Sequence, residues 1–340
     1  MLSMIVIDNV GSSEAEPPLR RRWLCLLLLL VLIYGSHAPL ISLTIVDGRV
    51  PFSPSSCVLL IEFIKLVLSF AALVASGNLS GLKISAWTVA PYAVPALLYA
   101  FNNNLVVFMQ AYMDPSSFQV LSNLKIASTA LLYTACLGKR LRLGQWLALG
   151  MLVAAGVCHS YSGLEGEASD ESAVRLHITS WGLLLVLVYC FISGLAAVYT
   201  ERVLKTQRLP LSLQNLFLYV FGVGINLASH LSGGGQQGFF EGFSALVWLI
   251  IAGQAANGLL MSVIMKHGTG ITRLFVISSS MLVNGVLSWG ILGIQLTPYF
   301  LFPVVLIGWA VYLYYSDFFF PCWIRCAMEL LDFLLELQVL

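Results

Sequence analysis

Ten long apolar segments divide this 340-residue chain and constrain its fold more than any other feature. A helix needs about 20 apolar residues to cross a bilayer. The chain is 59% hydrophobic and only 10% charged, whereas soluble domains carry about 25% charged residues. The sequence therefore predicts an all-α integral membrane protein. The segments are 23–45, 55–76, 86–112, 115–137, 143–161, 178–203, 212–231, 242–266, 270–293 and 297–315.

The positions of lysine and arginine predict how these segments are oriented, because cytosolic loops of membrane proteins are enriched in both residues. Arg20 to Arg22 flank the first segment and are expected in the cytosol. With ten segments, the cytosolic loops then hold Lys83, residues 139–142, residues 202–208 and Lys266, and the opposite loops hold Arg49 and Arg175. Both termini are therefore expected to face the cytosol.

A weak internal repeat predicts the domain organisation. Residues 138–157 resemble residues 293–311 at an offset of 155, and each stretch would close a five-helix unit. Because five is odd, the second unit would be inverted, an arrangement typical of secondary transporters with a site between the halves. The predicted parts are a cytosolic tail (1–22), a first repeat (23–161), an acidic lumenal loop (162–177), a second repeat (178–315) and a C-terminal tail (316–340).

The C-terminal tail is expected to form an amphipathic helix on the membrane surface. Its leucines recur at helical spacing against Glu329, Asp332 and Glu336, which suits an interfacial helix. An eleventh membrane span is the alternative interpretation.

Other function classes find little support in the sequence. The histidines are scattered, the seven cysteines form no CxxC pair, and no catalytic or phosphate-loop motif is present. The sequence therefore predicts neither an enzyme nor a metal site or cofactor. A net charge of +1 also gives no general attraction for nucleic acid.

Lys125 is the most unusual residue, because it lies inside the fourth apolar segment. A lysine at the centre of a membrane helix costs about 2.5–3.5 kcal/mol on insertion scales. It has no acidic residue three or four positions away; it could pair with Glu62 or Glu201 on another segment, or bind an anionic ligand. Unit charges 4 Å apart attract by about 4 kcal/mol at an effective dielectric of 20, so a phosphate would offset the cost. We favour a ligand.

Further polar side chains interrupt the apolar segments. They are Asn102 to Asn104 near Tyr99, Tyr199 with Glu201, Asn215 with Tyr219, and Ser262 with Lys266 and Arg273. Asparagine and serine often join helices, at about 0.6 kcal/mol per contact, and the tyrosines could be ordinary packing. Glu62 and Lys65 are three residues apart, which predicts an ion pair with a structural or gating role.

At these motifs the chain resembles the eukaryotic nucleotide-sugar transporters of the drug/metabolite transporter superfamily, in the group of the CMP-sialic acid and UDP-galactose carriers. The resemblance covers residues 23–315. It rests on Tyr99 with Asn102 to Asn104, Phe118-Gln119 with Lys125, residues 194–205, Asn215 with Tyr219, and residues 262–266 with Arg273.

The resemblance implies ten helices in two inverted five-helix repeats around a central cavity. It implies a Golgi antiporter, with the endoplasmic reticulum as the alternative, that exchanges a cytosolic UDP-sugar, CMP-sugar or CDP-ribitol for lumenal nucleoside monophosphate. By motif, Lys125 and Arg273 would contact phosphate, and Tyr199 and Ser262 would line the cavity. The base and ribose would be framed by Tyr99, Asn102, Asn103, Phe118, Asn215 and Tyr219.

Three departures from the family pattern leave the substrate open. Arg273 and Phe118 stand where the sialic acid carrier has lysine and tyrosine, and Asn102 replaces a glutamine. Arginine keeps the charge and can grip a diphosphate bidentately. These departures also keep an alternative open, in which the chain is a non-transporting membrane scaffold with the same fold. The expected partners are nucleotide, membrane lipid and, as a further possibility, the chain itself or related transporters in an oligomer.

Overall fold

The computed structural model describes residues 17–46, 50–77, 84–109, 112–113, 115–167, 179–232, 238–293 and 300–315. Within these ranges the regular elements are all helices and none is a β-strand, which confirms the all-α prediction. The predicted C-terminal amphipathic helix, most of the N-terminal tail and residues 168–177 of the acidic loop lie outside the described residues. Residues 162–167 of that loop continue the preceding helix to Glu167.

Eight of the ten predicted segments are helices long and apolar enough to cross a membrane. This agrees with a multi-pass membrane protein. Seven of them correspond to single helices: α1 (Pro17–Ser42), α2 (Pro54–Ala75), α7 (Leu143–Glu167), α8 (Ser180–Thr206), α9 (Leu211–Ser232), α10 (Ala245–His267) and α11 (Gly270–Leu292). The eighth, residues 117–137, combines α5 (Pro115–Leu121), the 3-10 turn η2 (Ser122–Leu124) and α6 (Lys125–Leu137).

The two remaining segments are shorter or interrupted. Residues 86–109 form α3 (Ala86–Val89), η1 (Ala90–Tyr92) and α4 (Ala93–Met109). Pro91 and Pro95 fall near these junctions, and proline lacks the N–H that a continuous helix needs. Residues Leu301–Tyr315 form the other short apolar helix. Helix length alone thus supports eight crossings, and the count of ten stays a prediction.

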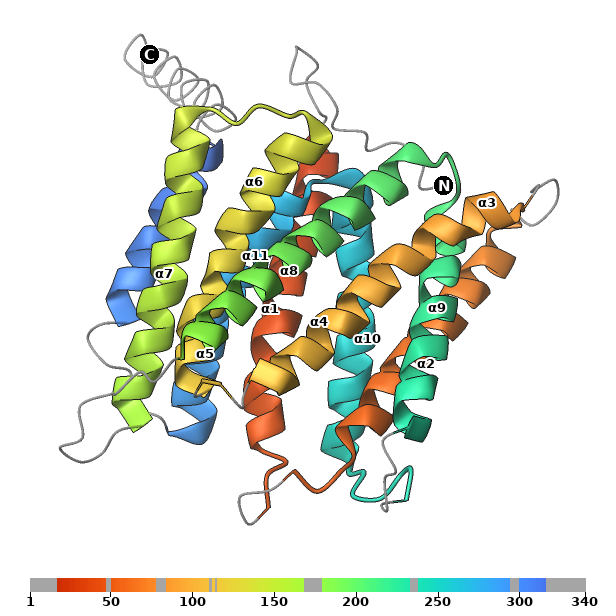
Figure 1. The fold of residues 1–340 in the computed structure, drawn as a ribbon, viewed down its shortest axis with the longest axis horizontal. Helices are drawn as coiled ribbons and strands as arrows, with labels where there is room; N and C mark the ends of the chain where they lie inside the picture. Colours follow the sequence, from red (N-terminus) through yellow and green to blue (C-terminus); the bar gives the residue numbers. More distant parts are fainter. Residues whose placement is uncertain are drawn as a thin grey trace, which may run out of the picture.

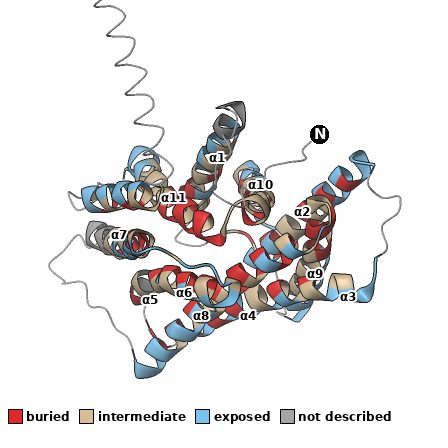
Figure 2. Ribbon diagram, turned by 90° about the horizontal axis from the view of Figure 1, so that it is seen from above, coloured by how far each residue is buried: buried red, intermediate tan, exposed pale blue. Residues whose placement is uncertain are grey.

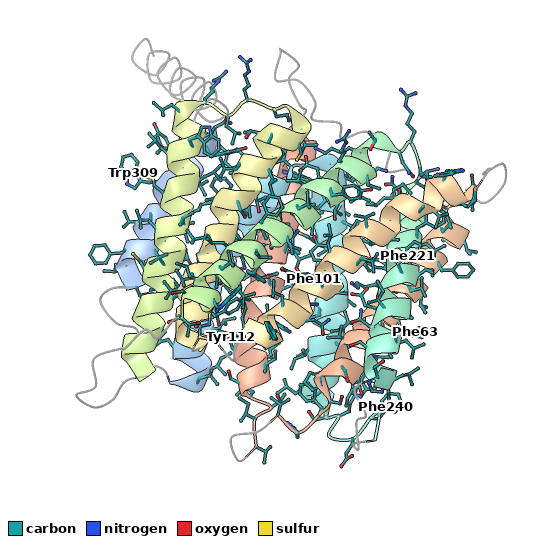
Figure 3. The ribbon with its side chains drawn as sticks, viewed as in Figure 1. Phe63, Phe101, Tyr112, Phe221, Phe240 and Trp309 are labelled. Carbon is teal, nitrogen blue, oxygen red and sulfur yellow. The ribbon has the colours of Figure 1, made fainter. Side chains whose placement is uncertain are left out.

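The helices pack side by side in one bundle, and the long ones run in alternate directions (Figure 1). The pairs α2–α9, α1–α11, α6–α8 and α4–α8 pack along their lengths. Buried residues gather where helices face one another (Figure 2). Large aromatic side chains such as Phe63 and Trp309 point outward, and they are 50% and 55% exposed (Figure 3). An apolar exterior suits a bundle surrounded by lipid.

Short polar residues and glycines fix the helix ends. Thr179, Ser244 and Thr269 each accept a hydrogen bond from a backbone N–H in the first turn of α8, α10 and α11. Such caps satisfy N–H groups that have no partner inside the helix. Gly138 ends α6 and Gly293 ends α11, both with positive φ (65° and 69°), a conformation that glycine adopts without strain.

Candidate functional site

A cavity of about 330 Å³ lies inside the bundle. Seven helices contribute to its wall: α1, α2, α4, α8, α9, α10 and α11. Seven of the residues singled out from the sequence line it, namely Glu62, Lys65, Tyr99, Asn103, Tyr219, Ser262 and Arg273. The fold therefore brings together polar residues that are up to 211 positions apart in the chain, from Glu62 to Arg273.

Arg273 projects into this cavity from the first turn of α11, and its hydrogen-bond partner among the described residues is a neutral group. Its Nη1 donates a hydrogen bond of 3.0 Å to the Tyr99 hydroxyl, and its guanidinium lies 6.0 Å from the centre of the Tyr99 ring. Tyr34 and Tyr189 are further electrostatic neighbours. The Nε atom is buried without a hydrogen-bond partner. The side chain is thus held in place by phenols that do not neutralise its charge.

Lys125 lies beside Arg273, although it is not part of the cavity wall. It is close enough for the two like charges to repel each other. The 3-10 turn η2 ends directly before it, so Lys125 starts α6 within the continuous span 117–137. Both carboxylates considered as its partners are engaged elsewhere: Glu62 with Lys65 and Glu201 with Lys205. Neither carboxylate is therefore the ion-pair partner of Lys125 in this structure, and the anionic ligand stays a prediction.

The predicted Glu62–Lys65 ion pair is present in the cavity wall. The Lys65 ammonium donates to Glu62 Oε1 at 2.6 Å and lies 4.5 Å from the centre of the Tyr219 ring. Two glycines make room for the pair. A Cβ at Gly222 would lie 2.8 Å from Glu62 Oε2, and one at Gly258 would lie 2.7 Å from Lys65 Cδ.

The remaining predicted residues lie around the cavity rather than on its wall. Asn215 donates a 2.8 Å hydrogen bond to Ser262 Oγ and so joins α9 to α10, the helix-joining role weighed in the sequence analysis. Asn102 is buried and its Oδ1 has no partner. The Phe118 ring packs 5.2 Å from that of Tyr189. Tyr199 packs against the apolar cluster that contains Tyr92, Leu204 and Phe217.

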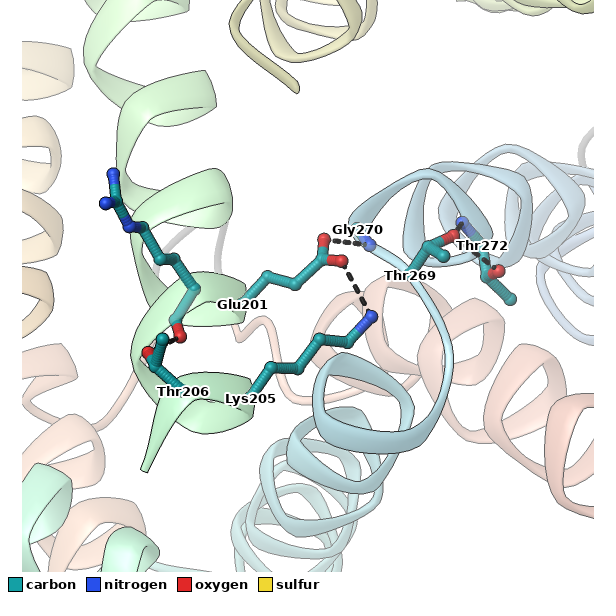
Figure 4. A network of polar contacts seen from close by, with 7 residues as sticks. Glu201, Lys205, Thr206, Thr269, Gly270 and Thr272 are labelled. Carbon is teal, nitrogen blue, oxygen red and sulfur yellow. Dashed lines mark hydrogen bonds and ion pairs between the residues drawn. The ribbon is translucent and has the colours of Figure 1, made fainter. Parts of the chain in front are cut away.

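Glu201 forms a buried contact between α8 and the start of α11 (Figure 4). Its side chain is 1% exposed, and its Oε1 pairs with Lys205 at 2.9 Å. Its Oε2 accepts a 2.6 Å hydrogen bond from the backbone N–H of Gly270. Gly270 lies three residues before Arg273. The contact therefore ties α8 to the helix turn that carries the cavity arginine.

The sequence reasoning missed four polar wall residues, Tyr34, Thr200, Asn226 and Asn257. Asn226 follows Tyr219 by seven residues and Asn257 precedes Ser262 by five. Residues seven apart lie on the same helix face, so the position of Asn226 relative to Tyr219 could have revealed it. Asn257 offers no comparable spacing signal.

Comparison with known proteins gives a consistent result. The model of the family described as "Nucleotide-sugar transporter" matches residues 22–315. A Danio rerio protein called "Probable UDP-sugar transporter protein SLC35A4" is 75% identical over 316 residues, which cover 92% of this chain and all of the relative. Proteins of the same name from Xenopus tropicalis and Homo sapiens are 54% and 53% identical, over 91% and 92% of this chain and 98% and 99% of their own lengths.

A solved structure also has a similar fold. A crystal structure described only as that of a protein matches with a TM-score of 0.64 and 16% sequence identity, over 85% of this chain and 94% of that chain. At this identity the likeness concerns the fold alone.

Proposed function

The chain belongs to the nucleotide-sugar transporter family, and on that premise we propose that it is an antiporter for pyrimidine nucleotide-sugars. It would exchange a cytosolic UDP-sugar, CMP-sugar or CDP-ribitol for a lumenal nucleoside monophosphate. The printed name of the relatives favours a UDP-sugar among these.

One observation carries the proposal: Lys125 and Arg273 lie together without a carboxylate partner among the described residues. Two cations close enough to repel each other are costly in an apolar bundle. A phosphate or diphosphate offers charge and several acceptor oxygens, and arginine can bind it through two N–H groups. Tyr99, Asn103 and Tyr219 on the cavity wall would frame the base and ribose, with Asn102, Phe118 and Asn215 behind them and Tyr199 and Ser262 nearby.

The same proposal covers the architecture. α4 and residues 301–315 would complete ten crossings in two inverted five-helix units, since these two short helices run alongside the eight long ones (Figure 1). Both termini would face the cytosol, as the lysine and arginine pattern predicts. The family resemblance supports the Golgi membrane as the location, and imaging of the full-length chain with Golgi and endoplasmic reticulum markers tests it.

Transport would proceed by alternating access, with Glu201 closing the cytosolic face and the Glu62–Lys65 pair within the cavity wall. An empty cavity leaves both cations without a counter-charge, so the change of conformation costs less with either nucleotide bound. This difference would enforce exchange.

Uptake into proteoliposomes tests exchange directly. Vesicles preloaded with CMP or UMP should take up labelled nucleotide-sugar faster than empty vesicles. Equal uptake by both would contradict obligatory exchange.

Binding tests the phosphate assignment. CMP, UMP, CDP and UDP should be screened for thermal stabilisation of the wild-type chain and of Lys125→Ala. We expect at least one nucleotide to stabilise the wild type and none to stabilise the variant. Normal CMP or UMP binding by Lys125→Ala would show that the lysine does not hold the phosphate. Stabilisation of neither protein by any nucleotide would support the scaffold alternative.

A further inference from the structure

The helix that carries Lys125 is irregular in the turn that precedes this residue. The span 117–137 contains the 3-10 turn η2 directly before Lys125, and the Lys125 backbone N–H bonds to the Ser122 carbonyl oxygen three residues earlier. A 3-10 helix has about 3.0 residues per turn and an α-helix about 3.6. The three residues of η2 therefore rotate Lys125 by about 60° more around the helix axis than an α-helix would.

This extra rotation determines where the Lys125 ammonium lies. Side chains of a helix extend about 5–6 Å from its axis, so a rotation of about 60° moves their ends by about 5–6 Å. That displacement is larger than a hydrogen bond, which is about 3 Å long. In the structure Lys125 lies close enough to Arg273 for the two charges to repel each other. The proximity of the two cations thus depends on η2.

Three side chains hold η2 in this conformation: Asn123 in the turn itself, Ser160 on α7 and Cys190 on α8, here called the η2 cluster. Each is 2% exposed, and α7 and α8 both pack against η2. The Asn123 amide nitrogen donates to the carbonyl oxygens of Gln119 at 3.0 Å and Val120 at 3.1 Å. It also donates to Ser160 Oγ at 3.2 Å. A side chain that bonds to carbonyls three and four residues earlier competes with the regular helix pattern.

Cys190 contacts the carbonyl oxygen that η2 sets free. In an α-helix the Lys125 N–H would bond to the Leu121 carbonyl oxygen, four residues earlier, whereas here it bonds to that of Ser122. The Cys190 Sγ lies 3.9 Å from the Leu121 oxygen and 4.0 Å from the Ser122 oxygen, and a thiol is a weak donor. The Ser128 hydroxyl donates to the Cys190 carbonyl oxygen at 2.6 Å. α8 is therefore bonded to the chain on both sides of Lys125.

α7 leaves room for Asn123 at one position. Gly156 lies four residues before Ser160, on the same helix face, and a Cβ at Gly156 would lie 2.6 Å from Asn123 Cγ. Asn123 thus packs directly against the α7 backbone while it is bonded to Ser160. Contacts to two neighbouring helices therefore fix the residue that shapes η2.

We propose that Asn123 is a positioning residue for phosphate binding, which acts through η2 to aim the Lys125 ammonium at the phosphate that Arg273 also binds. This proposal rests on the proposed function, because it takes Lys125 and Arg273 as the phosphate site. Asn123 is not part of the cavity wall, so its effect on the ligand passes through Lys125. A leucine at position 123 favours a regular helix and lacks the amide that holds η2, so Lys125 turns away from Arg273.

Binding of uridine and UMP, and of cytidine and CMP, to the full-length chain in nanodiscs tests the proposal. The members of each pair differ only in the phosphate. We expect Asn123→Leu to weaken binding of the monophosphate roughly tenfold and to change binding of the nucleoside less than about twofold. Equal weakening of nucleoside and monophosphate, or an unchanged affinity for the monophosphate, would overturn the proposal.

Two further variants separate positioning from a general loss of structure. Ser160→Ala removes one partner of Asn123 and is the milder change; it should weaken monophosphate binding roughly threefold and spare the nucleoside. Asn104→Leu is the matched control, because Asn104 also bonds to a carbonyl four residues earlier, that of Ala100 at 2.8 Å, but is exposed on α4. It should bind all four ligands as the wild type does. If Asn123→Leu does not fold and Ser160→Ala binds like the wild type, the proposal is wrong.

A double-mutant cycle tests whether Asn123 acts through Lys125. Lys125→Gln removes the charge and keeps a long side chain, so Arg273 alone holds the phosphate. In that background Asn123→Leu should change monophosphate binding, measured at millimolar ligand, less than about twofold. A full tenfold loss there would contradict the proposal, since Asn123 would then act on another group. A wild type that binds the monophosphates no more tightly than the nucleosides would instead refute the proposed phosphate site itself.

Discussion

Under the proposed alternating access, the contact between Glu201 and Gly270 would hold the cytosolic face closed. The Glu201 carboxylate is buried, spans from α8 to the first residue of α11, and accepts the Gly270 N–H at 2.6 Å. Opening a path to the cavity between α8 and α11 would break this bond. Glu201→Gln keeps an oxygen acceptor but removes its charge, whereas Glu201→Ala removes the acceptor.

The size of the effect follows from the bonds involved. A hydrogen bond to a charged group contributes about 1.5–3 kcal/mol and a neutral one about 0.5–1.5 kcal/mol. The ion pair with Lys205 lies within α8, so it does not distinguish the closed face from an open one. Glu201→Gln should therefore destabilise the closed face by about 1.4 kcal/mol, a roughly tenfold shift in population. Glu201→Ala should cost about 2–3 kcal/mol, or roughly 30- to 150-fold.

Cysteine labelling measures this shift. Met265 lines the cavity near the end of α10 and is 2% exposed, so Met265→Cys in a background without the seven native cysteines reports opening. Its labelling from the cytosolic side by an impermeant maleimide should accelerate by the factors above. Glu241→Gln is the control, because Glu241 also accepts a glycine N–H, from Gly238 at 2.8 Å, but in the α9–α10 loop. Unchanged labelling in both Glu201 variants would refute the gating role.

Three further predictions concern binding and stability. Arg273→Lys should weaken UDP binding roughly tenfold in calorimetry, because lysine cannot form two parallel bonds to a diphosphate. Gly156→Ala would place a Cβ 2.3 Å from Asn123 Oδ1 and should displace η2 before Lys125, lowering nucleotide affinity, whereas Gly150→Ala on the same helix meets open space and should not. Gly242 has a φ of +76°, and a Cβ there would lie 1.9 Å from the Pro51 carbonyl oxygen. Gly242→Ala should therefore lower the melting temperature by an amount that corresponds to about 1–3 kcal/mol. Gly253→Ala is its control, because a Cβ at Gly253 meets open space.

Apolar length predicted the helices well, because a bilayer demands long apolar runs with satisfied backbones. It was less informative where the backbone departs from a regular helix. The segment 86–112 is interrupted near Pro91, and the segment 115–137 contains the 3-10 turn η2. No proline or glycine marks η2. Its Asn123 donates to the carbonyl oxygens of Gln119 and Val120 and to Ser160 on α7, contacts that a single sequence does not reveal.

The sequence predicted which residues form the candidate site, but it did not predict most of the hydrogen bonds between them. Glu62, Lys65 and Arg273 stand out because a charge in an apolar segment is costly to place in a membrane. The spacing of three residues alone predicted that Glu62 pairs with Lys65. The sequence left Asn215 open between ligand binding and helix joining, and the bond to Ser262 depends on how α9 packs on α10. Glu201 accepts a hydrogen bond from a backbone N–H. Nearly every residue carries such a group, so the sequence does not show which one is the partner.

The distribution of charge along the cavity gives the site a direction. At the 155-residue offset of the sequence repeat, Lys125 corresponds to Ser280 and Arg273 corresponds to Phe118. Neither counterpart is charged: the Ser280 hydroxyl bonds its own helix at Ile277, and Phe118 packs on Tyr189. Two symmetric cation sites would spread positive charge over both ends of the cavity. Here the two cations lie close enough to repel each other, and neither has a charged counterpart at the symmetry-related position. A ligand whose phosphate is held by this asymmetric pair of cations therefore binds in one orientation, whichever face of the membrane it enters from.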